Sequence, residues 1–203
     1  MRVYVVHVDE MSAGSTAERI VAAAMAIVTD EGADAVTMRR VAADVGLSTM
    51  ATYRHFPGRT ALLQAVTESA NAELGKNWTA GTASTVEDRV LVLLGHFLDF
   101  VLSHPHLYSF LMTERRADAR KFPEDFRDHA SPAFTPLLEV IEEGMRDGSL
   151  RSDDDPLEAA MSINAVATGL VQLYLAGRIG CSEQEFRQLC VRSVRRVLRG
   201  LRP

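Results

Sequence analysis

Two short stretches with helical spacing, joined by a single glycine, constrain the fold of this chain more than any other feature. In the first stretch, Val41, Ala42 and Val45 share one helical face, and Gly46 can adopt the left-handed conformation that ends a helix. Ser48 can then cap the next helix. Two helices that cross closely need a small residue at the crossing and a glycine in the turn, which Ala42 and Gly46 provide. The segment therefore predicts a helix-turn-helix.

The sequence on either side predicts two helices that support this pair. Apolar residues recur at helical spacing over residues 16–31, and a longer helix is expected over 59–78. Together with the helix-turn-helix they form a four-helix domain over residues 15–78. Residues 1–14 have no helical period and are expected to form a flexible arm, or an upstream extension if Met11 is the natural start.

Beyond the small, polar segment at 79–85, the sequence again predicts only helices. Prolines and the loop "DGSLRSDDDP" separate them, and no alternating β pattern competes. We therefore expect an all-α fold, in which the helix-turn-helix domain is followed by a larger helical domain over residues 79–203. The expected helices of this larger domain are 86–103, 105–115, 122–129, 131–147, 157–179 and 183–201.

Positive charge is concentrated in one region of an acidic chain. The formal net charge is −5, yet residues 37–60 hold four arginines against one aspartate. A polyanion partner is therefore expected only at this local surface.

The sequence shows no feature that directs the chain to a membrane or out of the cell. No apolar run approaches the roughly 18 residues that span a bilayer, and the opening "MRVYVVHVDE" is unlike a secretory signal. Cys181 and Cys190 have no flanking histidine at metal-ligand spacing. We expect a cytoplasmic protein with reduced thiols, no membrane partner, no bound metal and no cofactor.

The second helix of the pair can present a polar face to DNA. We place Thr52 at the centre of its core-facing arc, and successive residues turn by about 100°. Phe56, Thr49 and His55 then lie near the core, Met50 and Arg54 point outward, and Ala51 and Tyr53 flank them.

The chemistry of this outward face suits base readout in the major groove. Arg54 can bridge O6 and N7 of guanine, Met50 and Ala51 can touch thymine methyl groups, and Tyr53 can donate to phosphate. Hydroxyls and arginines at nearby helix starts can hold flanking phosphates. The full set of expected DNA contacts is Thr37, Arg39, Arg40, Ser48, Thr49, Met50, Ala51, Tyr53, Arg54 and Arg59.

The stretch "VAADVGLSTMATYRHFPGRTALL" resembles the DNA-binding signature of the tetracycline-repressor (TetR) family, approximately "G-V-S-x-G-T-L-Y-x-H-F-x-x-K-x-x-L". The resemblance implies that the helix after Ser48 is the recognition helix, that Arg59 stands in the place of a phosphate-contacting lysine, and that Phe56 is a core residue. Met50 and Ala51 replace the usual Gly-Thr, and Thr52 replaces a core leucine. We expect the Thr52 hydroxyl to donate to the carbonyl of Ser48, one turn earlier.

The same resemblance implies a homodimer formed by the last two helices, with effector binding in the larger domain. The residues support a dimer, because the helix over 157–179 is apolar around much of its circumference, although both helices can instead be buried within one subunit. A two-fold dimer predicts a palindromic operator. We expect a ligand-responsive transcriptional regulator, a repressor that a small-molecule effector releases from DNA.

Two mixed polar and aromatic stripes in the larger domain can line an effector pocket. One stripe lies on the helices over 86–103 and 105–115, and a polar one recurs every four residues on 157–179. Such stripes also occur in ordinary cores and as hydrogen bonds between helices. The candidate pocket residues are His96, Phe100, His104, Tyr108, Met112, Phe134, Leu138, Asn164, Thr168 and Gln172.

Two other functions remain open on the sequence. An all-helical enzyme with His96 or His104 as its base is one, but no G-x-S-x-G elbow, H-E-x-x-H motif, P-loop or glycine-rich dinucleotide turn is present. We therefore expect no catalytic residues and no enzymatic activity. The other is a helical dimer whose DNA-binding module has decayed, for which Met50 and Thr52 are the clues.

Overall fold

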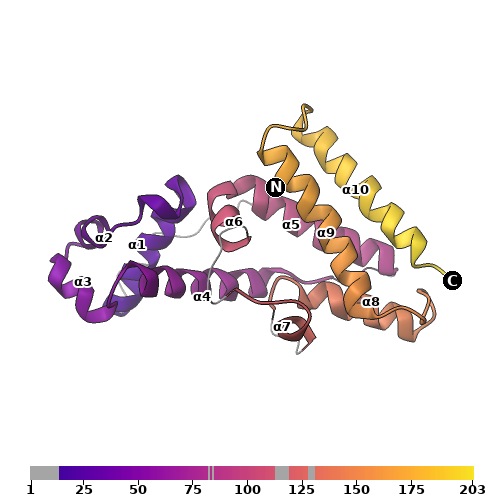
Figure 1. Cartoon of the computed structure of the whole chain (residues 1–203), viewed down its shortest axis with the longest axis horizontal. Helices are drawn as coiled ribbons and strands as arrows, with labels where there is room; N and C mark the ends of the chain where they lie inside the picture. Colours follow the sequence, from indigo (N-terminus) through magenta and orange to yellow (C-terminus); the bar gives the residue numbers. More distant parts are fainter. Residues whose placement is uncertain (1–13, 82, 84, 113–118, 128–130) are drawn as a thin grey trace. The chain divides into compact units, whose positions relative to one another are not determined.

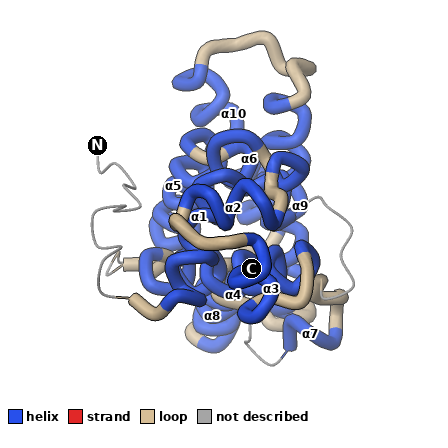
Figure 2. Tube along the Cα trace, turned by 90° about the vertical axis from the view of Figure 1, so that its left-hand side faces the viewer, coloured by secondary structure: helices blue, strands red, loops and turns tan. Residues whose placement is uncertain are grey.

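The described part of the chain is helical throughout, which confirms the predicted all-α fold. The computed structural model describes residues 14–81, 83, 85–112, 119–127 and 131–203, and none of these residues lies in a strand (Figure 1, Figure 2). The expected arm at 1–14 falls outside these ranges except for Gly14. The elements are α1 (Thr16–Glu31), the 3-10 helix η2 (Ala33–Ala35), α2 (Met38–Asp44), α3 (Thr49–His55), α4 (Arg59–Asn77), α5 (Val86–Ser103), α6 (Pro105–Met112), α7 (Glu124–Arg127), α8 (Thr135–Arg146), α9 (Pro156–Leu175) and α10 (Glu183–Gly200).

The helices follow the sequence patterns, and the differences lie at their ends. α1 and α5 have the predicted bounds. α8 starts at Thr135 instead of residue 131, because the chain first makes a turn in which Ser131 accepts from the backbone of Phe134 and Thr135. α9 ends at Leu175 because Gly177, with φ of 66°, takes the left-handed conformation. The remainders of the predicted helices 105–115 and 122–129 include residues outside the described ranges.

Contacts within the chain define two compact units. Unit 1 comprises residues 1–73 and 100–119, and unit 2 comprises residues 74–99 and 120–203. In unit 1, α6 packs against α1 and η2, although it lies beyond residue 79 in the sequence. The predicted division into 15–78 and 79–203 stays a prediction about function.

The core of unit 1 is built around α1. Ile20 and Val28 of this helix are fully buried, as are Val41 of α2 and Leu62 of α4. A capping box at Ser15 and Glu18 satisfies free backbone N–H groups at the start of α1. The helix-turn-helix therefore stands on a well-packed support.

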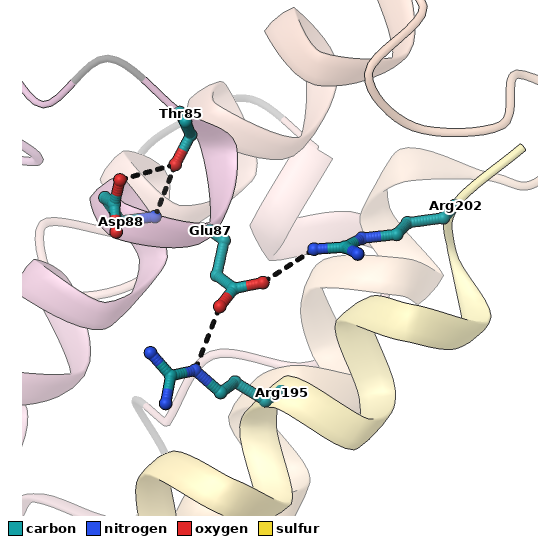
Figure 3. Close-up of polar contacts among 5 residues, drawn as sticks. All are labelled: Thr85, Glu87, Asp88, Arg195 and Arg202. Carbon is teal, nitrogen blue, oxygen red and sulfur yellow. Dashed lines mark hydrogen bonds and ion pairs between the residues drawn. The ribbon is translucent and has the colours of Figure 1, made fainter.

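In unit 2, α9 packs against both α8 and α10. The rings of Tyr174 and Phe186 stack at 4.0 Å between α9 and α10, and Phe186 is fully buried. Glu87 at the start of α5 accepts from Arg195 (2.9 Å) and Arg202 (2.8 Å), which ties α5 to the end of the chain (Figure 3). α10 is thus held by aromatic packing against α9 and by ion pairs with the start of α5.

Candidate nucleic-acid interface and ligand cavity

Local hydrogen bonds set the ends of the two short helices of the predicted helix-turn-helix. Thr37 caps α2 by accepting from the backbone N–H of Arg40 at 3.2 Å. At the other end of α2, Leu47 N–H donates to Ala42 O at 2.8 Å, and Gly46 adopts a φ of 70°. This pattern is a Schellman motif. Ser48 then caps α3 by accepting from Ala51 N–H at 3.1 Å, so the predicted caps and turn are confirmed.

The inner side of α3 is defined by Thr52. Its side chain is 0% exposed, and its hydroxyl donates to Ser48 O at 3.4 Å, as the sequence predicted. A donor–acceptor distance of 3.4 Å is long for a hydrogen bond from a hydroxyl to an oxygen, so this hydrogen bond is weak. Phe56 and Thr49 are half-buried beside it.

The outer side of α3 presents the residues that the helical wheel placed there. Met50 is 69% exposed, Tyr53 is 46% exposed, and Arg54 is also exposed. Ala51 is half-buried, as a flanking position should be. The expectation for His55 was wrong: its side chain is exposed, because α3 ends there and Phe56 turns back toward the core in its place.

The four arginines of the positive region have different surroundings. Arg40 pairs with Glu31, and this hydrogen bond holds the pKa of the Glu31 carboxyl below its ordinary value. Arg59 donates to the carbonyls of Ala33 (2.7 Å) and Val36 (3.0 Å), and it lies 3.6 Å from Asp34. Its guanidinium thus holds the loop that leads into α2, and its role as a phosphate contact stays a prediction.

Arg39 and Arg54 differ from this pair. Both are exposed, and the described residues offer neither of them a recorded hydrogen bond or ion pair. Their guanidinium donors are therefore available to an external acceptor.

Sequence reasoning missed one residue that orients the helix-turn-helix. Arg19 of α1 donates to the carbonyl of Val45, at the end of α2, at 2.9 Å. This bond fixes the C-terminal end of α2 to its support, as Arg59 fixes the N-terminal end. No local signal marks such a contact, because its partners are 26 residues apart.

A small cavity lies within unit 2. Its volume is about 40 Å³, and the rings of Trp78 and Phe97 meet edge to face at 6.1 Å in its wall. Of the ten predicted pocket residues, Asn164 alone belongs to its lining. The lining residues are Trp78, Val90, Leu93, Leu94, Phe97, Ala133, Leu137, Ile163, Asn164 and Ala167.

The other predicted pocket residues of unit 2 take other places. Phe134 and Leu138 are buried in the core. Thr168 and Gln172 are half-buried on α9. His96 is also half-buried, and its Nδ1 atom has no hydrogen-bond partner among the described residues. None of these side chains contributes to the cavity wall.

Four predicted pocket residues belong to unit 1 and do not line this cavity. Tyr108 is fully buried and Phe100 nearly so, whereas Met112 is 44% exposed. The Nδ1 atom of His104 lies 3.3 Å from the carbonyl of Phe100, and their rings are 5.8 Å apart. These residues do not line the cavity, because α6 packs on α1 and η2, and their role in an effector pocket stays a prediction.

Three other features bear on function: metal sites, cysteine pairs and membrane-spanning helices. No group of three or more His, Cys, Asp or Glu side chains in the described part of the chain can hold a metal ion. Cys181 and Cys190 are not bridged, and burial raises the pKa of Cys190 to about 11. No single helix among the described residues is long and apolar enough to cross a membrane. By length and composition alone, the bent pair of α5 and α6 could cross one.

The chain combines a second helical unit with a capped helix-turn-helix, whose second helix carries an outward arginine and tyrosine. This combination is typical of helix-turn-helix regulators of transcription. Residues 20–66 match the family described as "Bacterial regulatory proteins, tetR family", and residues 90–198 match "Tetracyclin repressor-like, C-terminal domain". This chain belongs to the TetR family of DNA-binding transcriptional regulators. Regulators of this family bind operator DNA through the N-terminal domain, respond to small molecules and act as dimers.

Several characterised proteins are similar to this chain. The HTH-type transcriptional repressor DrrR1 of Streptomyces coeruleorubidus is 33% identical over 88 residues, which are 40% of this chain and 33% of DrrR1. The nucleoid occlusion factor SlmA of Pasteurella multocida is 23% identical over 168 residues, 79% of this chain and 82% of SlmA. The chain spans less than two thirds of DrrR1 and of SlmA from Haemophilus influenzae, 33% and 62% respectively.

Solved structures share the fold over nearly the whole chain. A protein of unknown function from Rhodococcus sp. RHA1 aligns with a TM-score of 0.76 at 22% identity, over 94% of this chain and 97% of that one. The regulator FadR of Bacillus subtilis, solved in complex with stearoyl-CoA, aligns with a TM-score of 0.71 at 12% identity, over 91% and 98%.

Proposed function

We propose that this protein is a repressor whose homodimer binds a palindromic operator through the outward face of α3 and leaves it when a small molecule occupies the cavity of unit 2. The observation that carries the proposal is the orientation of α3. Thr52 faces the core while Met50, Tyr53 and Arg54 face outward. We propose the effector and the operator as its ligands, and we propose no enzymatic activity and no cofactor.

The outward face of α3 divides base readout between two side chains. Arg54 is exposed and makes no hydrogen bond or ion pair with the described residues, so it can donate two parallel hydrogen bonds to O6 and N7 of a guanine. Met50 has no hydrogen-bonding group that can read a base edge strongly, but it can pack against thymine methyl groups. Each half-site should therefore contain a guanine close to one or more thymines.

The neighbouring polar groups position the helix on the DNA backbone. Arg39 is exposed and has no recorded bond among the described residues, and Tyr53 carries a phenolic donor. The hydroxyls of Thr37 and Ser48 accept from backbone N–H groups in their own helices, which leaves their protons free to donate to phosphate oxygens. Arg40 can join them only by leaving Glu31.

Dimerisation through α9 and α10 gives this surface its two-fold symmetry. α9 packs on α8 and α10, yet its Leu173 and Leu175 are 44% and 39% exposed. We assign these exposed apolar side chains to contact with a second copy. Two recognition helices then meet half-sites separated by one helical turn of DNA or a multiple of it. The protein acts where operator DNA is, in the bacterial cytoplasm.

Selection of bound genomic fragments, followed by fluorescence anisotropy on the selected duplex, tests the proposal. Arg54→Ala should weaken binding by about 10- to 100-fold, because it removes a bidentate base contact. The matched control is Arg146→Ala, which removes an exposed arginine from α8 and should leave the affinity nearly unchanged. Equal affinities of the two variants, or an affinity indifferent to salt, would contradict the proposed readout.

A folded protein that retains no genomic duplex at all would instead favour the second candidate, a helical dimer without DNA-binding activity. The observation behind that candidate is the weak 3.4 Å hydrogen bond of Thr52, at the position of a leucine in the family signature.

A further inference from the structure

The wall of the unit 2 cavity is almost entirely apolar. Nine of its ten lining residues are apolar, and Trp78 and Phe97 contribute two aromatic rings. None of the ten is charged. An ion that entered this cavity would lose its hydration without gaining a counter-charge, which is strongly unfavourable. The wall therefore selects against ionised ligands.

Asn164 supplies the one side chain of the lining that can both donate and accept a hydrogen bond, because the indole N–H of Trp78 can only donate. Its carboxamide has two N–H donors and one acceptor oxygen. Among the described residues, its recorded hydrogen bond is a 4.0 Å contact from Nδ2 to the sulfur of Met161, and sulfur is a weak acceptor. The amide thus retains unused capacity to bind one hydrogen-bonding group of a ligand.

The size of the cavity limits the part of a ligand that it can hold. A water molecule needs about 10–15 Å³ of such space, and the cavity measures about 40 Å³. It is smaller than the roughly 150 Å³ that a benzene ring needs. It therefore fits a compact group, such as the end of a short branched chain, and not a whole ring.

We propose that the ligand of this cavity is an uncharged, mainly apolar molecule with a compact end that packs on Trp78 and Phe97 and gives or accepts one hydrogen bond at Asn164. Its identification as the effector rests on the proposed function, because ligand binding and release of DNA are separate events. The ligand class itself depends only on the wall of the cavity.

Trp78 allows direct measurement of binding, because it is the single tryptophan of the chain. The test titrates the full-length protein at neutral pH with isopentane, isobutanol and isobutyrate, which share a branched end, have similar sizes and differ in one substituent. A change in tryptophan fluorescence reports ligand in the cavity. We expect the alcohol to bind about two- to ten-fold more tightly than the hydrocarbon, as one neutral hydrogen bond allows. The carboxylate should bind at least about 100-fold more weakly, because it must first take up a proton.

Asn164→Leu distinguishes a ligand contact from general packing. The variant should lose the preference for the alcohol while it keeps or gains affinity for isopentane. Gln184→Leu, which changes an exposed amide on α10, is the matched control and should behave as the natural protein does. Thermal melting of each variant shows whether it is folded.

Three results would overturn the inference: carboxylate binding as tight as alcohol binding, an unchanged alcohol preference in folded Asn164→Leu, or no fluorescence change with any of the three compounds. Anisotropy of the operator complex is measured in parallel. Alcohol binding that obeys the expected order without releasing DNA would contradict the proposed effector role and leave the ligand class standing.

Discussion

The α2–α3 pair and the α9–α10 pair are each two consecutive helices, but different forces hold them in place. α2 and α3 have seven residues each, too short to be stable alone, and their ends are fixed by side-chain caps, a Schellman motif and the carbonyl bonds of Arg19 and Arg59. α9 and α10 have 20 and 18 residues and rely on buried apolar area, such as the Tyr174–Phe186 stack. Directional bonds thus orient the surface that we propose to read DNA, whereas the long pair carries exposed apolar residues that we assign to a partner.

The largest expected effect concerns the apolar packing of the long pair. Phe186→Ala should reduce the free energy of unfolding by about 3–5 kcal/mol, because it opens a cavity beside Tyr174. Chemical denaturation measures this loss, with the exposed Gln184→Ala as control. A loss below about 1 kcal/mol would mean that buried area is not what holds α10.

Arg59→Met tests the directional bonds of the short pair. It leaves the carbonyls of Ala33 and Val36 without their donor, so the free energy of unfolding should fall by about 1–2 kcal/mol. The slope of log affinity for DNA against log salt should stay unchanged, because this guanidinium binds carbonyls of the protein.

Arg39→Met is the matched control and should show the reverse. Its stability should be unchanged, while the slope of log affinity against log salt should become shallower by about 0.9, the value for one phosphate contact. A shallower slope with Arg59→Met instead would confirm Arg59 as a phosphate contact.

Two cap deletions separate stability from DNA binding. Ser48→Ala removes the cap of α3, and Thr85→Ala removes that of α5, where the Thr85 hydroxyl accepts from Asp88 N–H at 3.1 Å (Figure 3). Each should cost about 1 kcal/mol of unfolding free energy. Only Ser48→Ala should weaken operator binding, and an equal loss of affinity in both variants would show that caps act through stability alone.

The smallest effect is a pH dependence from Glu31. Its pKa in the folded protein is lowered from 4.5 by the hydrogen bond with Arg40, so its stabilising contribution is complete above pH 4.5 and is lost as pH falls through the lower folded value. Unfolding curves across this acidic range should show a smaller loss for Glu31→Gln than for the natural protein. Parallel curves would mean that the pair does not contribute.

Much of the helix-turn-helix could be predicted from sequence because its determinants are local. Caps at Thr37 and Ser48, the left-handed Gly46 and the burial of Thr52 all follow from residues within one or two turns of each other. His55 was misplaced because the wheel takes no account of where a short helix ends.

The cavity could not be predicted in the same way. Its wall brings together Trp78, residues of α5 and residues of α9, and only their packing shows which stripe faces it. Asn164 was predicted from its spacing on α9. Tyr108 and Met112 were predicted from a stripe of residues that continues along α6, and α6 belongs to unit 1. The bonds of Arg19 and Arg59 to backbone carbonyls were missed, because their acceptors lie 26 and 23 residues away in the sequence.

Guanine methylation interference on the selected operator tests most directly whether the outward face of α3 reads DNA. Methylation of N7 blocks the acceptor that Arg54 should use. The natural protein should lose binding when one particular guanine in each of two symmetric half-sites is methylated, and Arg54→Ala should be indifferent to that methylation. An unchanged interference pattern in Arg54→Ala, or interference in a single unsymmetrical site, would contradict the account.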